Sequence, residues 1–496
     1  MKGDTNNQTG RLSIRRSLVM SLAQKYTSFL LTLPTIMILS RLLTPAQIGI
    51  FSVAMAVIAL VHMLRDFGVS QFIVQHETAD PNVVRTAFTI NLLIAWLLGA
   101  TVFFSSHAVG VFYREPGVAR VLEVVAASFF LIPFGSTIRA LLRRNMAFGK
   151  LYMIQTTESL IRSTAAITLA FSGFGYMSLA WASLLSMAAS VVACGFWGAR
   201  YRVRGVSLAH WREVTRFGIA RATGDVAAQI GMRSSDIIIG RVLGMAAAGL
   251  YSRGYGLINM FRENVVGAVN AVAFSTFAER HRGKARPDEA FLQSLTLLTA
   301  VSWPFFLFAV LMAFPIMRIM FGSQWDAAVP LLQWLAAAAM VGTLIFQCNY
   351  FFTAIGRVGV ATRNEVVFQS VRVGIVLVAA YQSIEMVAAA QVLVYVIAVG
   401  IYYRDLSRIA QISMSRLAQA LVPSVLVTVA AGIGPGSVFI LDRPSADNLW
   451  TPLLLSGASA LVGWVIGVYA VRHPLASEIT RLVTRRRNAT VERLSA

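Results

Sequence analysis

Long apolar runs separated by short polar breaks recur along the whole chain. Most runs are about 20 residues long, the length of α-helix that crosses the hydrocarbon core of a bilayer. They are continuously apolar and do not alternate as the strands of a membrane β-barrel would. The pattern therefore predicts an all-α polytopic membrane protein with about fourteen transmembrane helices. The predicted spans lie near residues 18–40, 47–74, 86–106, 119–138, 151–171, 176–197, 217–239, 246–277, 290–315, 327–349, 362–380, 384–403, 418–440 and 450–471.

Two short segments about 200 residues apart carry the same pattern of residues. Ser40–Ser52 and Gly240–Ser252 align without a gap. The identical pairs are Arg41 and Arg241, Leu43 and Leu243, Ala46 and Ala246, Gly49 and Gly249, and Ser52 and Ser252. Each segment lies between two apolar runs, which predicts a tight hairpin tip between two membrane helices. Gly49 and Gly249 would allow close approach where the second helix begins.

This echo, with a second one between 147–150 and 354–357, predicts a duplicated architecture. Two copies with an even number of spans each would form two pseudo-symmetric six-helix bundles related by an axis along the membrane normal. The predicted parts are a cytoplasmic N-terminus at 1–17, an N-terminal bundle at 18–197, a basic cytoplasmic linker at 198–216, a C-terminal bundle at 217–403, two extra helices at 404–471 and a basic cytoplasmic tail at 472–496.

Composition agrees with a membrane class, since 57% of the residues are hydrophobic and 13% are charged. The net charge of +21 does not point to nucleic acid, because most of it lies in loops. If the N-terminus is cytoplasmic, the cytoplasmic segments hold 29 of the 43 Lys and Arg residues, the opposite side six, and the spans eight. This asymmetry predicts that both termini are cytoplasmic. The apolar run after Arg11, Arg15 and Arg16 imitates a signal peptide, but no small-x-small cleavage site follows before Arg41, so the first span is predicted to be retained.

The eight cations inside the predicted spans are Lys25, Arg65, Arg162, Arg221, Arg233, Arg253, Arg262 and Arg372. A charge in hydrocarbon costs about 3 kcal/mol or more, so each must face a partner or a water-filled cavity. Three of them have a carboxylate three or four residues away on the same helical face, which predicts structural ion pairs. These pairs are Glu158 with Arg162, Arg221 with Asp225, and Arg233 with Asp236.

Lys25, Arg65 and Arg262 lie in the cytoplasmic third of their spans, roughly 22 to 27 Å from the predicted outer tips. Spans one, two and eight would surround one central cavity in the duplicated arrangement. The guanidinium fork suits phosphate oxygens, so a cationic cavity open to the cytoplasm predicts an anionic, phosphorylated substrate from the inner leaflet. The alternative is that these side chains extend to the interface and bind only lipid headgroups. Nearby aromatic residues, such as Tyr255 and Trp303, could stack on sugar rings, although aromatic belts at the membrane interface and packing explain them as well.

Enzyme and metal signatures do not appear in the sequence. It has no Walker motif, no His-x-x-x-His pair, no Asp-x-Asp cluster and no long outer loop for a catalytic domain. Cys194 and Cys348 both lie in apolar runs, which favours packing over a disulfide or metal site. We therefore predict no catalytic residues, no metal and no cofactor.

The segments Leu39–Ser52, Asp66-Phe-Gly68 and 236–240 resemble the Wzx-type polysaccharide transport family. That family belongs to the multidrug/oligosaccharidyl-lipid/polysaccharide (MOP) exporter superfamily, with the multidrug and toxin extruders (MATE) and the lipid II flippase. The resemblance implies two six-helix bundles around a central lumen, alternating access, and undecaprenyl-diphosphate-linked oligosaccharide as substrate. Relatives place cations of the first, second and eighth spans in the lumen. The matching candidates for substrate binding here are Lys25, Arg65, Arg253 and Arg262.

The leading hypothesis is therefore a flippase of the bacterial inner membrane that serves exopolysaccharide or lipopolysaccharide assembly. Asp225 and Asp236 are candidate carboxylates for coupling to an ion gradient. Candidate partners are membrane lipids, a polysaccharide polymerase and export machinery, but no nucleic acid. A MATE-like drug or cation extruder is an alternative, although a positive lumen would repel cations. The other alternative is a membrane polysaccharide polymerase or glycosyltransferase, which would need the outer catalytic loop that the sequence lacks.

Overall fold

The computed structural model describes residues 4–65, 69–75, 80–203, 205–282, 287–477 and 480. In some helical stretches, 217–227 among them, only the backbone is described. Residues 66–68 of the resemblance and most of the predicted basic tail lie outside the described residues. Within these limits every regular element is helical, which confirms the predicted fold class.

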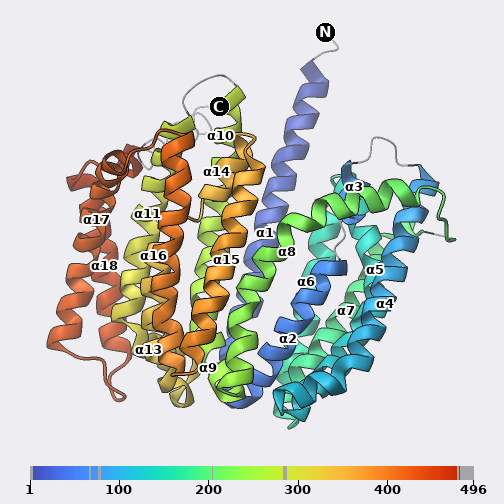
Figure 1. Cartoon of the computed structure of the whole chain (residues 1–496), viewed down its shortest axis with the longest axis horizontal. Helices are drawn as coiled ribbons and strands as arrows, with labels where there is room; N and C mark the ends of the chain where they lie inside the picture. The colour runs from blue at the N-terminus through green and yellow to red at the C-terminus, as the bar shows by residue number, and fades with distance from the viewer. Residues whose placement is uncertain are drawn as a thin grey trace, which may run out of the picture. The chain divides into compact units, whose positions relative to one another are not determined.

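The chain divides into two compact units, residues 1–249 and 250–496. The first unit contains the helices up to α8 and the first residues of α9 (Figure 1). These helices are α1 (Asp4–Leu42), α2 (Pro45–Arg65), α3 (Val69–Gln75), α4 (Pro81–Tyr113), α5 (Pro116–Arg144), α6 (Phe148–Phe171), α7 (Met177–Trp197), η1 (Ala199–Tyr201) and α8 (Trp211–Val242). Helix α8 begins inside the segment that the sequence predicts as a linker.

The second unit contains most of α9 and all later elements. These are α9 (Met245–Phe261), the π-helix η2 (Arg262–Val266), α10 (Gly267–Arg282), α11 (Pro287–Leu311), α12 (Ala313–Phe321), η3 (Ser323–Ala328), α13 (Val329–Gly342), α14 (Cys348–Ala354), α15 (Val358–Ala380), α16 (Ile384–Ile409), α17 (Met414–Leu441) and α18 (Trp450–Ala470). The two predicted extra helices are α17 and α18, which lie together beside α11 (Figure 1).

Nine helices or helical stretches in the described residues are long and apolar enough to cross a membrane, so the chain is a multi-pass membrane protein. They are α2, α4, α5, α7, α11, η3 with α13, α16, α17 and α18. The predicted number of about fourteen stays a prediction. The other five predicted spans begin in α1, α6, α8, α9 and α15, and each of these helices carries Lys or Arg near its middle.

Two long predicted spans are interrupted within the described residues. The ninth divides into α11 and α12, and the tenth into α13 and α14. A span of 26 residues, such as 290–315, would extend about 39 Å as a straight helix, beyond the roughly 30 Å hydrocarbon core. Pro315, predicted inside span nine, instead lies in the first turn of α12, where its missing N–H is not needed.

Both predicted hairpin tips are confirmed by the helix boundaries. Helix α1 ends at Leu42 and α2 begins at Pro45, while α8 ends at Val242 and α9 begins at Met245. At the first tip, the Thr44 hydroxyl accepts from the Gln47 N–H, and the Gln47 amide oxygen accepts from the Thr44 N–H. These reciprocal bonds satisfy two donors at the start of α2.

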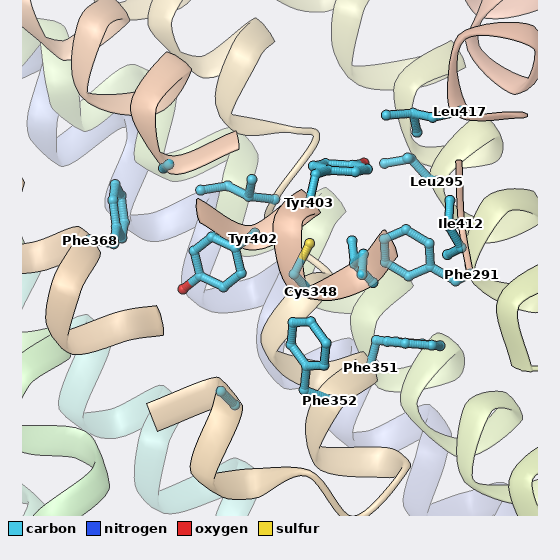
Figure 2. Packing of buried hydrophobic residues seen from close by; sticks show 14 of the residues in the cluster. Phe291, Leu295, Cys348, Phe351, Phe352, Phe368, Tyr402, Tyr403, Ile412 and Leu417 are labelled. Carbon is cyan, nitrogen blue, oxygen red and sulfur yellow. The ribbon is translucent and has the colours of Figure 1, made fainter. Parts of the chain in front are cut away.

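The core of the second unit is rich in aromatic rings (Figure 2). Phe351 of α14 lies with its ring centroid 5.0 Å from that of Phe291 and 5.6 Å from that of Phe277. Cys348, Phe351 and Tyr402 are almost fully buried in this cluster. Such edge-to-face and tilted ring contacts contribute more free energy than the burial of their surface alone. They hold α10, α11, α14 and α16 together around the polar residues of the second unit.

Candidate functional site

The candidate site begins where the eighth predicted span changes helix type. Arg262 opens the π-helix η2, and the N–H of Gly267 donates to the carbonyl of Arg262 five residues earlier. A π-turn inserts one extra residue, and such turns often occur at functional sites. The wider turn lies between α9 and α10 at the position of a predicted lumen cation.

Arg262 lines a pocket inside the second unit. We call it the arginine pocket. Its polar lining comes from α9, η2, α15 and α16 and consists of Tyr255, Asn259, Arg262, Arg372, Gln391 and Tyr395. Its apolar lining includes Ile258, Leu335, Ala338, Ala339 and Phe346. Among the described residues, no Asp or Glu lines this pocket.

Neutral groups hold the Arg262 side chain. Its Nη2 donates to the amide oxygen of Asn259 at 3.0 Å, and the Asn259 amide nitrogen donates to Glu263 at 2.7 Å. The Arg262 guanidinium carbon also lies 5.9 Å from the ring centroid of Phe346, within cation–π range. The guanidinium is therefore oriented by an amide and a ring.

Arg372 is the second cation of the arginine pocket and is 5% exposed. Its Nη2 donates to the Tyr395 hydroxyl at 3.0 Å, and its Nη1 donates to Gln369 at 3.5 Å. Its guanidinium carbon lies 5.0 Å from the ring centroid of Phe368 and 5.3 Å from that of Tyr395. A buried guanidinium held this way keeps its charge among hydrogen-bond acceptors and π-faces.

Glu365 lies one helical turn from Gln369 on α15 and is linked to Arg372 through it. The Glu365 carboxylate accepts from Gln369 at 2.7 Å, from Asn349 at 2.6 Å and from Tyr402 at 2.9 Å. In the described part of the chain, no Lys, Arg or His forms an ion pair with Glu365. The Glu365 carboxylate therefore acts on Arg372 only through the neutral amide of Gln369, which bonds to both side chains.

The donors that line the arginine pocket suit oxygen anions. Two guanidinium groups present planar sets of donors that match carboxylate and phosphate oxygens. Tyr255 offers an aromatic face in the same pocket and lies parallel to Tyr251, with 6.1 Å between ring centroids. An anion beside an apolar or sugar surface fits this combination.

The other predicted cations are distributed over both units. Arg253 does not line the arginine pocket. Its side chain instead packs against two aromatic rings, with the guanidinium carbon 5.8 Å from the ring centroid of Phe321 and 5.6 Å from that of Trp325. Lys25 lies on α1 and Arg65 is the last residue of α2, both in the first unit. Their gathering around one cavity with Arg262 stays a prediction.

The predicted carboxylates for ion coupling both lie on α8. Asp236 is half-buried, whereas the side chain of Asp225 lies outside the described residues. Arg233 and Asp236 lie near enough for their charges to interact, but in the described part of the chain they do not form the direct ion pair that the sequence predicts. Ion coupling by these residues stays a prediction.

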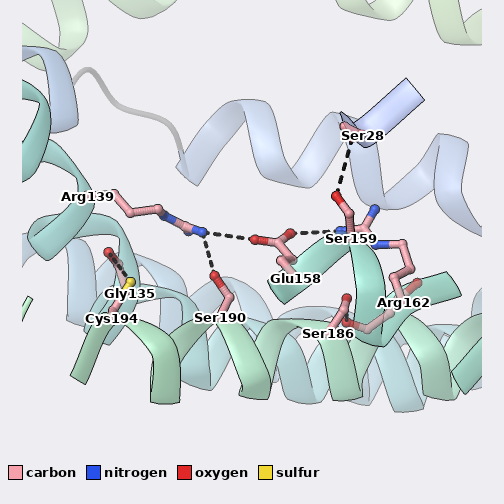
Figure 3. Close-up of polar contacts among 10 residues, drawn as sticks. Ser28, Gly135, Arg139, Glu158, Ser159, Arg162, Ser186, Ser190 and Cys194 are labelled. Carbon is pink, nitrogen blue, oxygen red and sulfur yellow. Dashed lines mark hydrogen bonds and ion pairs between the residues drawn. The ribbon is translucent and has the colours of Figure 1, made fainter. Parts of the chain in front are cut away.

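A charged cluster in the first unit confirms another predicted pair (Figure 3). Arg162 donates to Glu158 at 2.8 Å, and Arg139 of α5 donates to the other oxygen of Glu158 at 3.3 Å. Arg139 also donates to the Ser190 hydroxyl at 2.9 Å. The sequence assigns Arg139 to a cytoplasmic loop, but it lies within α5 and joins three helices of the first unit.

The sequence identifies Arg372 only as a cation inside a span and not as a site residue. Gln391, Tyr395 and Asn259 carry no signal of their own in an apolar run. Their meeting depends on which face each helix turns inward, and a position inside a span does not specify this. Trp303, a predicted sugar-stacking candidate, instead donates to the Met340 carbonyl at 2.9 Å.

Residues 38–330 match the polysaccharide biosynthesis protein family. The chain is 28% identical over 349 residues to the succinoglycan biosynthesis transport protein ExoT of Rhizobium meliloti, which covers 70% of each chain. It is 23% identical over 331 residues to the lipopolysaccharide biosynthesis protein WzxC of Escherichia coli, covering 66% of this chain and 67% of the relative.

Solved structures share the fold. The lipid II flippase MurJ, in an inward closed conformation, matches with a TM-score of 0.76 at 12% identity over 92% of this chain and 100% of that chain. An inward-facing multidrug resistance MATE family transporter of the MOP superfamily matches with a TM-score of 0.63 at 17% identity. This match covers 78% of this chain and 96% of that chain.

Proposed function

Because the chain belongs to the polysaccharide biosynthesis protein family, we propose that it is a flippase for lipid-linked oligosaccharides. It moves undecaprenyl-diphosphate-linked repeat units from the cytoplasmic to the outer leaflet of the bacterial inner membrane, for exopolysaccharide or lipopolysaccharide assembly. The observation that carries the proposal is the arginine pocket. Two guanidinium groups share this pocket, and no carboxylate of the described residues lines it.

Binding of the lipid diphosphate by cations explains how a charged headgroup leaves the inner interface. Lys25, Arg65 and Arg262 engage the diphosphate, while the oligosaccharide enters the polar interior and the lipid tail stays in the membrane. Each charge-assisted hydrogen bond replaces hydration that the headgroup loses. Alternating access then exposes the same groups to the outer side. Arg253, held against two rings, is a further substrate contact on this path.

The orientation and partners belong to the same proposal. Both termini lie on the side of the membrane where the connecting segments are rich in Lys and Arg, and such segments are typically cytoplasmic. A polymerase and export machinery receive the flipped unit at the outer leaflet. The protein carries out no covalent chemistry, in keeping with a relative named as a transport protein.

Sidedness of the lipid-linked oligosaccharide tests this proposal. In inner-membrane vesicles from cells lacking the protein, an impermeant lectin or glycosidase should find the oligosaccharide on the cytoplasmic face. The intact gene should restore it to the outer face. The Arg262→Gln variant should fail to do so at a normal protein level. The matched control is Arg404→Gln, which removes an exposed arginine of α16 outside the arginine pocket.

Three results would contradict the proposal. Normal sidedness in cells lacking the protein, with unlengthened units outside, would favour a polymerase. Resistance to cationic dyes on expression, without any change in sidedness, would favour an extruder. Full activity of the Arg262→Gln variant would remove the assigned site.

A further inference from the structure

Two buried nitrogen donors in the arginine pocket have no hydrogen-bond partner in the described part of the chain. They are Nε of Arg372 and the amide nitrogen of Gln391. Arg372 is 5% exposed and Gln391 is 3% exposed. Buried polar groups in native proteins almost always have partners, so an unpaired one requires an explanation. Two of them in one pocket indicate a missing acceptor.

The missing acceptor must satisfy the charge as well as the hydrogen bonds. Arg372 and Arg262 bring two positive charges to the pocket, and Gln391 adds a neutral N–H donor. Of the three Arg372 nitrogens, Nη1 and Nη2 already bond to Gln369 and Tyr395, which leaves Nε for a ligand. A group with at least two oxygen acceptors and a negative charge meets these requirements.

We propose that Arg372 and Gln391 form an oxyanion subsite that binds a carboxylate or phosphate group of the transported molecule. This inference rests on the proposed flippase function and deepens it. The shared chemistry is a compact oxygen anion, supplied either by an acidic sugar of the repeat unit or by the lipid diphosphate. The subsite selects the acidic substrate over a neutral one, because a neutral hydroxyl would leave the guanidinium charge uncompensated.

Glu365 and Gln369 are positioning residues for this subsite. Glu365 fixes the Gln369 amide at 2.7 Å, and that amide presents its oxygen to Nη1 of Arg372 at 3.5 Å. A carboxylate in direct contact would compete with the ligand for Arg372. The intervening amide keeps the Glu365 carboxylate about two helical turns from Arg372, so Nε of Arg372 remains available to an anion.

The test is direct binding of small anions to the purified full-length protein in detergent. The probes are inorganic pyrophosphate, which represents the diphosphate, glucuronate, which represents an acidic sugar, and glucose as the neutral control. Calorimetric titration gives the dissociation constant of each. We expect the wild type to bind at least one anion and to show no detectable binding of glucose.

The diagnostic variant is Gln391→Glu. It places a carboxylate in the pocket that Arg262 and Arg372 line, which offsets their positive charge and repels a ligand anion. The protein should remain folded, with an unfolding midpoint at or above that of the wild type, while anion binding weakens at least tenfold. The matched control is Gln382→Glu, which adds the same charge at an exposed position in the turn between α15 and α16. It should bind as the wild type does.

Each outcome decides the proposal. Binding of pyrophosphate alone assigns the subsite to the lipid diphosphate, and binding of glucuronate assigns it to an acidic sugar. Binding of neither anion, or equal binding by wild type and Gln391→Glu, overturns it. If the wild type restores sidedness in vesicles without binding either anion, the subsite is wrong and the flippase stands. If it binds an anion but does not change sidedness, the flippase and the assigned ligand source are wrong.

Discussion

The backbones of Gly49 and Gly249 are in direct contact, and each glycine comes from the same position of an echoed tip segment. A methyl group added to Gly49 would overlap the carbonyl oxygen of Met245 and reach 3.0 Å from the nitrogen of Gly249. A methyl group on Gly249 would overlap the carbonyl oxygen of Pro45 and reach 3.0 Å from the nitrogen of Gly49. The predicted close approach is confirmed, and it joins the two tips to each other.

The Gly249→Ala variant should be clearly less stable than the wild type. The added methyl group meets backbone atoms, which cannot rotate away, so the two tips must separate at a cost of about 3 kcal/mol. The thermal unfolding midpoint of the purified protein should fall. The matched control is Gly256→Ala on the same helix, where an added methyl group meets nothing within 4 Å. This control should be neutral or slightly stabilising, and equal midpoints for both variants would contradict the contact.

The double variant Gly49→Ala/Gly249→Ala provides a second test of the same contact. Since the first methyl group already separates the tips, the second should cost less than it does alone. A double-mutant cycle on unfolding midpoints measures this coupling. Strictly additive effects would mean that the two glycines act independently.

Glu158→Gln should destabilise the first unit. Glu158 accepts from both Arg139 and Arg162, and the exposed fractions of the Glu158 and Arg139 side chains are 17% and 21%. Loss of the carboxylate leaves the largely buried Arg139 guanidinium without its counter-charge, next to the more exposed Arg162, at a cost of about 2 kcal/mol. Comparison with Glu385→Gln, at an exposed position in the first turn of α16, controls for the loss of charge. The prediction fails if both variants unfold at the same temperature.

Stability of the α17–α18 attachment should depend on pH through His473, which follows α18. Burial lowers the pKa of the His473 side chain from its usual value of 6.5. Its Nδ1 accepts from the Leu475 N–H at 3.1 Å, and its Nε2 bonds the Ser424 hydroxyl at 3.2 Å. Below about pH 6.5 the unfolded chain binds a proton that the folded protein resists, so this contribution is present above that pH and lost as pH falls.

Unfolding midpoints between pH 7 and pH 5 test the histidine. The wild type should lose more stability over this range than His473→Gln, in which the titrating group is absent. All other titrating groups are shared by the two proteins and cancel in the comparison. A parallel decline in both would exclude His473 as the source.

Both cysteines should be inert toward thiol reagents in the native protein. Cys194 and Cys348 are each 0% exposed, and Cys348 lies among aromatic rings in the second unit (Figure 2). A maleimide should label neither residue before unfolding and both after denaturation in dodecyl sulfate, as counted by mass spectrometry. Rapid labelling of Cys348 in the native state would contradict the packing of α14.

The sequence alone predicts the helical membrane class and the two hairpin tips. A segment that crosses a bilayer needs about 20 apolar residues, and all its backbone groups must be hydrogen-bonded within the helix. Such a segment is visible in the hydropathy of the sequence alone. The repeated glycines also carried a local signal, because close backbone approach needs a residue without a side chain. The interruptions within long spans were not predicted, since hydropathy measures length and not the path of the helix.

The tertiary structure alone decided which polar residues share a pocket. Arg262 and Arg372 are more than 100 positions apart, and their meeting depends on the faces that η2 and α15 turn toward each other. Arg253 lies on the same predicted span as Arg262 yet packs against Trp325. From the sequence it follows that a charged residue inside a membrane helix must face a partner or a water-filled cavity. The identity of that partner depends on the packing between distant helices, which no local sequence pattern encodes.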